Sequence, residues 1–83
     1  MAVQIASKTA SGSVVTVQVS NSSSHETTVS VSLHVRVAGQ TIGITSGRTA
    51  IPANSTAPVT LQSPGTVEFI EDDPDPTVMI WED

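Results

Sequence analysis

The sequence predicts an all-β protein built as a single sandwich of about seven short antiparallel strands. Residues 27–37 alternate apolar and polar side chains without interruption, and residues 13–20 repeat the pattern. Neighbouring side chains of a strand point to opposite faces, so each run buries one face and exposes the other to water. Turn residues recur at short intervals along the rest of the chain, which is typical of a sandwich and leaves little room for helices.

The first part of the chain supplies the strands that set this pattern. Residues 2–7 alternate and are expected to form an edge strand, and residues 9–12 form the turn into residues 13–20. The serine-rich residues 21–25 indicate a connecting loop. We expect residues 27–37 to lie at the centre of a sheet, because their unbroken apolar face is the longest in the chain.

The middle of the chain continues with short strands and tight connections. Residues 38–40 have the composition of a hairpin loop, and residues 41–45 return the chain as the next strand. Residues 46–47 break that strand, and residues 49–51 are expected to pair briefly. Residues 52–55 then form a turn by composition.

A further strand is predicted at residues 56–62, with Val59 and Leu61 pointing inward. Pro58 should lie at its start or in an edge strand, because proline lacks the N–H that a sheet ladder needs. Residues 63–65 turn the chain again.

The next strand is predicted at residues 66–71, with Val67 and Phe69 facing the core. This register points Ile70 outward. An acidic, proline-containing loop follows at residues 72–76.

The last strand, residues 77–81, is apolar on both faces. If Val78 and Ile80 face the core, Met79 and Trp81 face outward, and the opposite choice exposes Val78 and Ile80. Something must cover the second face. One alternative is that the strand lies centrally in the sandwich, and another is that the N-terminal segment covers its outer face. A third is that a protein partner covers it, since Trp and Met are enriched in protein interfaces.

Composition limits the classes of partner. The chain has 83 residues, enough for one domain, and no cysteine, so no disulfide can stabilise it. Its formal net charge is −5, and the only basic residues are Lys8, Arg36 and Arg48. A nucleic acid or an acidic membrane surface would be repelled, whereas a basic protein surface would not. No stretch resembles a signal peptide or approaches the length of a membrane helix.

Four carboxylates within residues 71–75 form the densest cluster of charge. These are Glu71, Asp72, Asp73 and Asp75. They could offer oxygen ligands to Ca²⁺, but their spacing is not that of a calcium loop. The simpler interpretation is a solvated turn restricted by Pro74 and Pro76, and a third is an acidic patch that docks on a basic partner. We therefore expect neither a metal nor a cofactor.

The remaining polar residues give no sign of catalysis. His25 and His34 have no second ligand at metal-binding spacing and are expected to be exposed. No serine stands in a Gly-x-Ser-x-Gly elbow. We do not expect an enzyme.

Three stretches together resemble a known family of modules, namely residues 14–21, 29–39 and 51–61. They are similar to immunoglobulin-like modules of bacterial and archaeal surface proteins, particularly the CARDB type. The resemblance implies one immunoglobulin-like domain over residues 1–83 and no catalytic residues. The chain departs from the family in lacking the Gly-x-Tyr that leads into its last strands, since Gly65 is followed by Thr66 and Val67.

These observations favour a structural accessory protein that binds a large assembly. We expect a decoration (cement) protein on a phage or virus capsid, made in the host cytoplasm as a complete small gene product and bound to the major capsid protein. It could also form a homo-oligomer. The alternative is an immunoglobulin-like module of a cell-surface, adhesion or phage tail protein. A carbohydrate-binding module is disfavoured by the single Trp and the absence of Tyr. The expected partner-binding residues are Ile70, Asp72, Asp73, Asp75, Met79 and Trp81.

Overall fold

The protein is an all-β sandwich, with eight strands in the residues that the structure describes. The structure, a computed structural model, describes residues 2–73 and 75–81. The strands are β1 (Val3–Ser11), β2 (Val14–Asn21), β3 (Thr27–Val37), β4 (Gln40–Thr45), β5 (Thr49–Ile51), β6 (Ser55–Gln62), β7 (Phe69–Glu71) and β8 (Thr77–Trp81). Within the described residues, no helix has the length and apolar character needed to cross a membrane.

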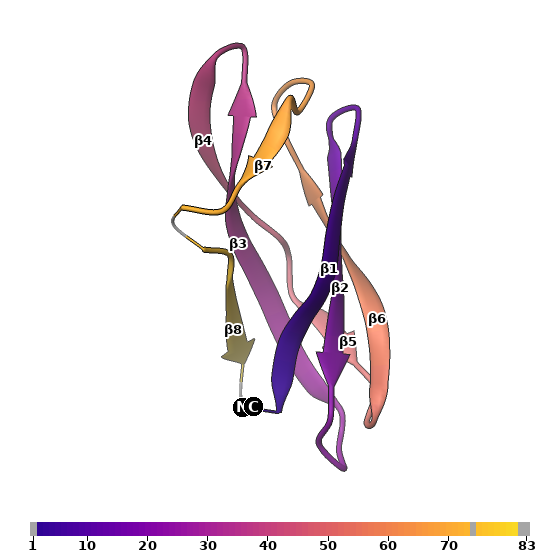
Figure 1. The fold of residues 1–83 in the computed structure, drawn as a ribbon. Coiled ribbons are helices and arrows are strands. Elements are labelled where there is room, and N and C mark those ends of the chain that lie inside the picture. The colour runs from indigo at the N-terminus through magenta and orange to yellow at the C-terminus, as the bar shows by residue number, and fades with distance from the viewer. Residues whose placement is uncertain (1, 74, 82–83) are drawn as a thin grey trace.

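Two antiparallel sheets face each other along the long axis of the molecule (Figure 1). The first sheet has the order β1-β2-β6. In the second, β3 is the central strand and pairs with β4, β5, β7 and β8. Ser32 of β3 pairs with both Thr45 of β4 and Thr77 of β8. A strand has only two edges, so β4 and β8 lie on opposite sides of β3.

The same reasoning places β5 on the same side of β3 as β4, and β7 on the same side as β8. Val29 pairs with Thr49 of β5 and Ile80 of β8, and Val35 pairs with Ile42 of β4 and Ile70 of β7. The central position expected for residues 27–37 is therefore confirmed.

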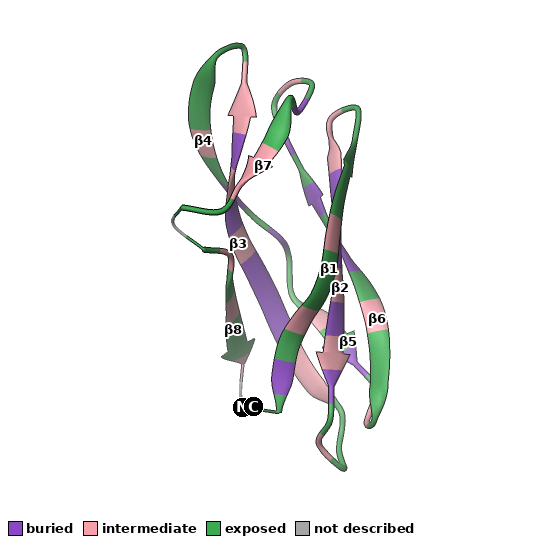
Figure 2. Ribbon diagram, viewed as in Figure 1, coloured by how far each residue is buried: buried purple, intermediate pink, exposed green. Residues whose placement is uncertain are grey.

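The core consists of aliphatic side chains from the facing surfaces of the two sheets (Figure 2). Because alternate side chains of a strand share a face, β2 buries every second residue, and β3 buries Val29, Val31, Leu33 and Val35 in the same alternation, with Ser30 buried on its other face. The buried apolar residues are Val3, Val15, Val17, Val19, Val29, Val31, Leu33, Val35, Ile44, Ile51, Val59, Leu61 and Val67.

Tight turns fix the register of two hairpins. Ala38 and Gly39 both have positive φ, 49° and 77°, as a two-residue hairpin with the favoured twist requires. Gly12, with φ 61°, turns the chain between β1 and β2. The turn predicted at residues 9–12 is thus wrong in extent, because β1 continues to Ser11 and pairs with Val14.

Pro58 lies within β6, an edge strand that pairs only with β2, as expected. The central position considered for the last strand is wrong, because β8 pairs with β3 alone and lies at an edge of its sheet.

Candidate interaction surface on β7 and β8

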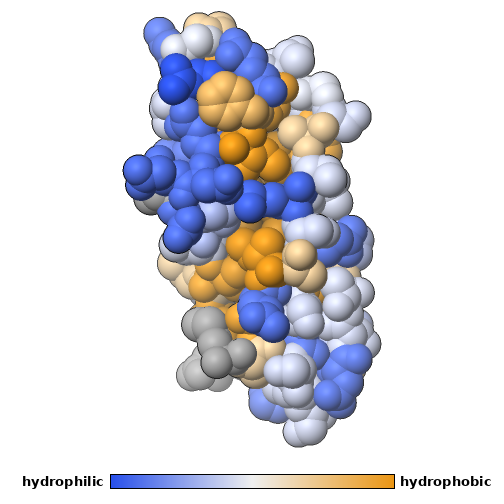
Figure 3. Space-filling model, viewed as in Figure 1, coloured by the Kyte–Doolittle hydropathy of each residue, from blue (hydrophilic) through white to orange (hydrophobic). Residues whose placement is uncertain are grey.

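The most exposed large apolar side chains of the described residues all lie on β7 and β8. Met79 is 56% exposed, Phe69 52% and Ile80 38%. We call residues 69–81, which run from β7 through the acidic loop to β8, the edge segment. Figure 3 shows that the face bearing β1, β7 and β8 carries two apolar areas separated by a hydrophilic band.

The register with β3 decides which side chains point outward. Phe69 is opposite Arg36, and Met79 is opposite Ser30, so both lie on the outer face of the sheet. Trp81 is opposite Thr28 and shares that face. Val78 and Ile80 point inward, opposite Val31 and Val29. The first of the two registers left open by the sequence is therefore the one that forms.

Ile70 faces inward, and the prediction that it faces outward is wrong. It is opposite Val35 and packs against the core, while Phe69, predicted to be buried, is exposed. Residues 66–68 do not form a strand. Instead, the N–H of Val67 donates to Gly12 O at 2.9 Å and that of Glu68 donates to Arg36 O at 2.8 Å. The chain crosses here from one sheet to the other, so the alternation begun at Val67 does not continue through β7.

All three basic side chains of the protein contact the edge segment. Lys8 Nζ lies 3.1 Å from Asp72 Oδ1, and Arg36 Nη2 lies 2.8 Å from Glu71 Oε1. The Arg48 guanidinium carbon lies 3.7 Å from the centre of the Trp81 ring. In the described residues, β7 and β8 pair with β3 and with no other strand. The three contacts therefore add to the backbone hydrogen bonds with β3 in holding the edge segment in place.

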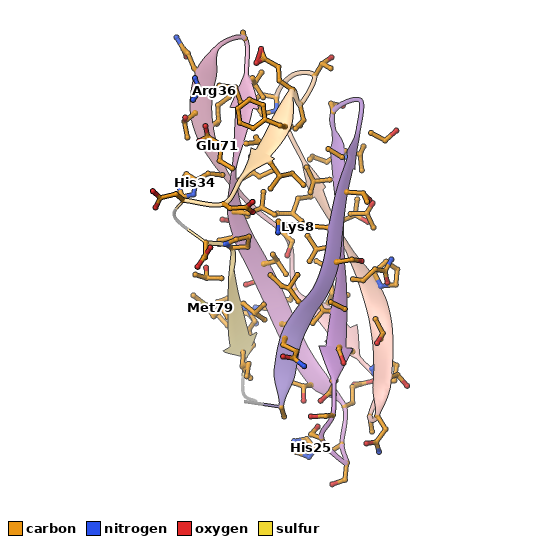
Figure 4. All side chains as sticks on the ribbon, viewed as in Figure 1. Lys8, His25, His34, Arg36, Glu71 and Met79 are labelled. Carbon is orange, nitrogen blue, oxygen red and sulfur yellow. The ribbon has the colours of Figure 1, made fainter. Side chains whose placement is uncertain are left out.

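The pair formed by Arg36 and Glu71 is the one of the three contacts that has two hydrogen bonds (Figure 4). Arg36 donates to Glu71 Oε1 through both Nε and Nη2, at 3.1 and 2.8 Å, and through Nη1 to Gly39 O at 3.1 Å. Its guanidinium also lies 5.6 Å from the centre of the Phe69 ring. A hydrogen bond from the Thr41 side chain, followed by those from Arg36, lowers the pKa of Glu71.

Trp81 has a structural role on the outer face. Its Nε1 donates to Ser30 Oγ at 3.0 Å, and Ser30 is buried. With Arg48 against its ring, the indole is half-buried rather than an exposed anchor. Met79 and Phe69 are therefore the more accessible apolar side chains of this face.

The acidic loop follows β7 directly. Asp72 forms the ion pair with Lys8 of β1, and Asp73 and Asp75 are exposed. Pro74, expected to restrict the loop, lies outside the described residues. No group of three or more metal-ligating side chains is found in the part of the chain that the structure describes. The absence of a calcium site stays a prediction.

The two histidines lie far apart, His25 in the loop before β3 and His34 on the outer face of β3 (Figure 4). His25 is exposed, as expected, but His34 is half-buried. His34 Nδ1 is a buried nitrogen that has no hydrogen-bond partner among the residues that the structure describes. In the described part of the chain, neither histidine belongs to a group of three or more metal-ligating side chains.

An open groove of about 500 Å³ lies where β1 begins and β8 ends. Ile80 and Trp81 line it from β8, Val3 lines it from β1, and His25 and Glu26 line it from the loop before β3. Sequence patterns could not predict that Glu26 lies near β8, because the two are far apart along the chain. Phe69 and Ile80 were likewise missed as exposed contacts.

Comparisons with known proteins give no relative from which a function can be transferred. No protein-family model matches the chain, and neither a curated protein nor a solved structure matches it.

Proposed function

We propose that this protein is a structural accessory protein that binds a large assembly, and specifically a decoration protein that stabilises a phage or virus capsid. The observation that carries the proposal is that the exposed large apolar side chains of the described residues cluster on the edge segment. Phe69 and Met79 are the most exposed of them. Exposed apolar groups that cluster rather than scatter indicate a protein interaction site.

The charge of the protein is consistent with a protein partner. Its net charge is −5, and each basic side chain already contacts the edge segment. The exposed Asp73 and Asp75 next to β8 favour a partner surface with basic character. A protein that binds only the assembled shell stabilises the shell by mass action.

The second candidate is an immunoglobulin-like module of a cell-surface, adhesion or phage tail protein. The two-sheet, all-antiparallel architecture favours it equally, because many surface modules share that architecture.

Sedimentation tests the proposal. Capsids assembled without this protein are mixed with the purified protein and separated on a density gradient. The protein should migrate with intact capsids at a fixed ratio to the major capsid protein, and capsids carrying it should resist heat better. Protein that stays at the top of the gradient, with undecorated capsids equally heat-resistant, would exclude the decoration role.

A further inference from the structure

We propose that the open edge of β8 accepts an extended segment of a partner protein in which apolar and basic side chains alternate. The inference rests on the proposed function and specifies how the partner is bound. In this binding mode the partner chain pairs as an additional strand, and its backbone supplies most of the hydrogen bonds.

The backbone groups available for such pairing follow from the register. The N–H of Val31 donates to Ser46 Oγ and its C=O accepts from the N–H of Ser46, both at 2.8 Å. The peptide groups of Val31 therefore point toward the β4 side of β3. Successive residues of a strand direct their peptide groups to opposite edges, so Ser30 points toward β8, where it pairs with Met79.

The alternation continues into β8. Because Met79 directs its N–H and C=O toward β3, those of Val78 and Ile80 point away from β3. Among the described residues β8 has no other strand partner, so these four groups lie along the open edge of the sheet. An added strand could bond to all of them.

Other edges of the sandwich carry features that oppose strand addition. β1 has an irregular register between Ile5 and Ser7, followed by Lys8. β6 contains Pro58, and β4 contains Gly43. Bulges, lysine, proline and glycine all weaken edge pairing. The five residues of β8 include no proline, glycine or charge, and four of them are apolar.

The side chains around β8 define the chemistry of the incoming strand. Its inward side chains would lie beside Val78 and Ile80, on the side of the sheet that faces β1, and would cover the exposed part of Ile80. These positions favour apolar residues.

Carboxylates flank both ends of β8. Asp73 and Asp75 precede it, and Glu26 lines the groove with Ile80 at its other end. Basic outward side chains on the partner would complement this charge. A second copy of the chain would instead bring its own carboxylates to the edge, and its three cations already contact its own edge segment.

The test uses a short end-blocked peptide of alternating valine and lysine as the probe. Residue-resolved amide hydrogen exchange is measured on the full protein with and without the peptide. At saturation, exchange of the Val78 and Ile80 amides should slow by about tenfold or more, because both become hydrogen-bonded. The Met79 amide already bonds to β3 and should change less. The same peptide with glutamate in place of lysine should protect neither amide.

A matched pair of variants separates edge pairing from contact with the outer face. Ile80→Lys points a charge inward at the edge and should abolish the protection at Val78. Thr77→Ser alters an exposed polar position on the outer face of the same strand and should keep peptide affinity within about twofold. Protection that is absent from Val78 and Ile80, or equal with the glutamate peptide, would overturn the proposal. Protection that rises with protein concentration alone, together with a dimer mass, would also overturn it and identify a second copy as the occupant.

Capsid binding distinguishes failure of this inference from failure of the proposed function. If Ile80→Lys decorates capsids as well as the wild-type protein does, strand addition is wrong while the decoration role stands. If the peptide protects the edge but no capsid binds the protein, the decoration role is wrong and the edge site stands.

Discussion

At the scale of single residues, an ion pair and the contacts of one indole ring hold the edge segment against the rest of the protein. Glu71 accepts two hydrogen bonds from Arg36, and Trp81 lies between the Ser30 hydroxyl and the Arg48 guanidinium. Each contact joins the edge segment to β3 or to the chain between β4 and β5. Loss of any one of them should therefore loosen the C-terminal edge before it affects the core.

Glu71 should make stability depend on pH in the acid range. Its pKa is lowered in the folded protein, so the stabilisation is fully present above the ordinary value of 4.5 and is lost as pH falls through the lower folded value. Denaturant unfolding between pH 6 and about pH 3 should show a steeper loss of unfolding free energy for the wild-type protein than for Glu71→Gln. Asp73→Asn, which changes an exposed carboxylate, is the control and should follow the wild-type curve. Identical curves for wild type and Glu71→Gln would show that the contact with Arg36 contributes nothing.

Trp81→Ala should lower the free energy of unfolding by about 2 kcal/mol, because it removes a hydrogen bond to a buried hydroxyl and the contact with Arg48. Trp81→Phe keeps an aromatic ring against Arg48 and should lose about 1 kcal/mol. Urea denaturation followed by circular dichroism measures both variants. An unchanged midpoint for Trp81→Ala would mean that the indole is not a structural element.

At the scale of strands, the alternation of apolar and polar residues predicted the bounds of the strands better than it predicted how the last strands pair. The bounds of β3, β5 and β8 match the predicted residues 27–37, 49–51 and 77–81, because alternation and turn residues are local signals. The edge position of β8 was left undecided, since two apolar faces are equally compatible with a central strand. The orientations of Phe69 and Ile70 were missed because the chain changes sheets at residues 66–68, where alternation is interrupted.

A substitution in the hairpin between β3 and β4 should stabilise the protein. Ala38 has φ 49°, a left-handed conformation that costs a residue with a Cβ about 1 kcal/mol. Asn-Gly is the preferred pair for a turn with two positive φ values, so Ala38→Asn should raise the free energy of unfolding by roughly 0.5–1 kcal/mol. Thermal unfolding gives the measurement, and Gly39→Ala should shift the midpoint the other way. A lower midpoint for Ala38→Asn would contradict this turn geometry.

The central strand should be intolerant of charge on its inner face. Leu33 is 2% exposed, so Leu33→Asp buries an unpaired carboxylate and should abolish cooperative folding. Ser32→Asp, on the outer face of the same strand, should remain folded. Circular dichroism and a thermal melt distinguish the two variants. A cooperative melt for Leu33→Asp would refute the register of β3.

At the scale of the whole molecule, the sandwich is narrow and presents a long exposed edge. The principal extents are 42 × 20 × 20 Å, so the two sheets enclose one thin aliphatic core. A domain of 83 residues buries a modest fraction of its surface, and partner contacts add stability by mass action. The same elongated shape presents β7, the acidic loop and β8 along one side. The proposed function requires attachment to the capsid through that side.

Occupancy of purified capsids by a variant lacking the outermost apolar side chains shows whether the protein attaches through the edge segment. Phe69→Ser combined with Met79→Ser changes two exposed side chains and should alter stability by about 1 kcal/mol or less. It should weaken capsid binding by about 2 kcal/mol or more, roughly thirtyfold, as loss of interface hot spots does. Thr60→Ala, at an exposed position of β6, should bind like the wild-type protein. Equal occupancy for all three proteins would contradict attachment through the edge segment.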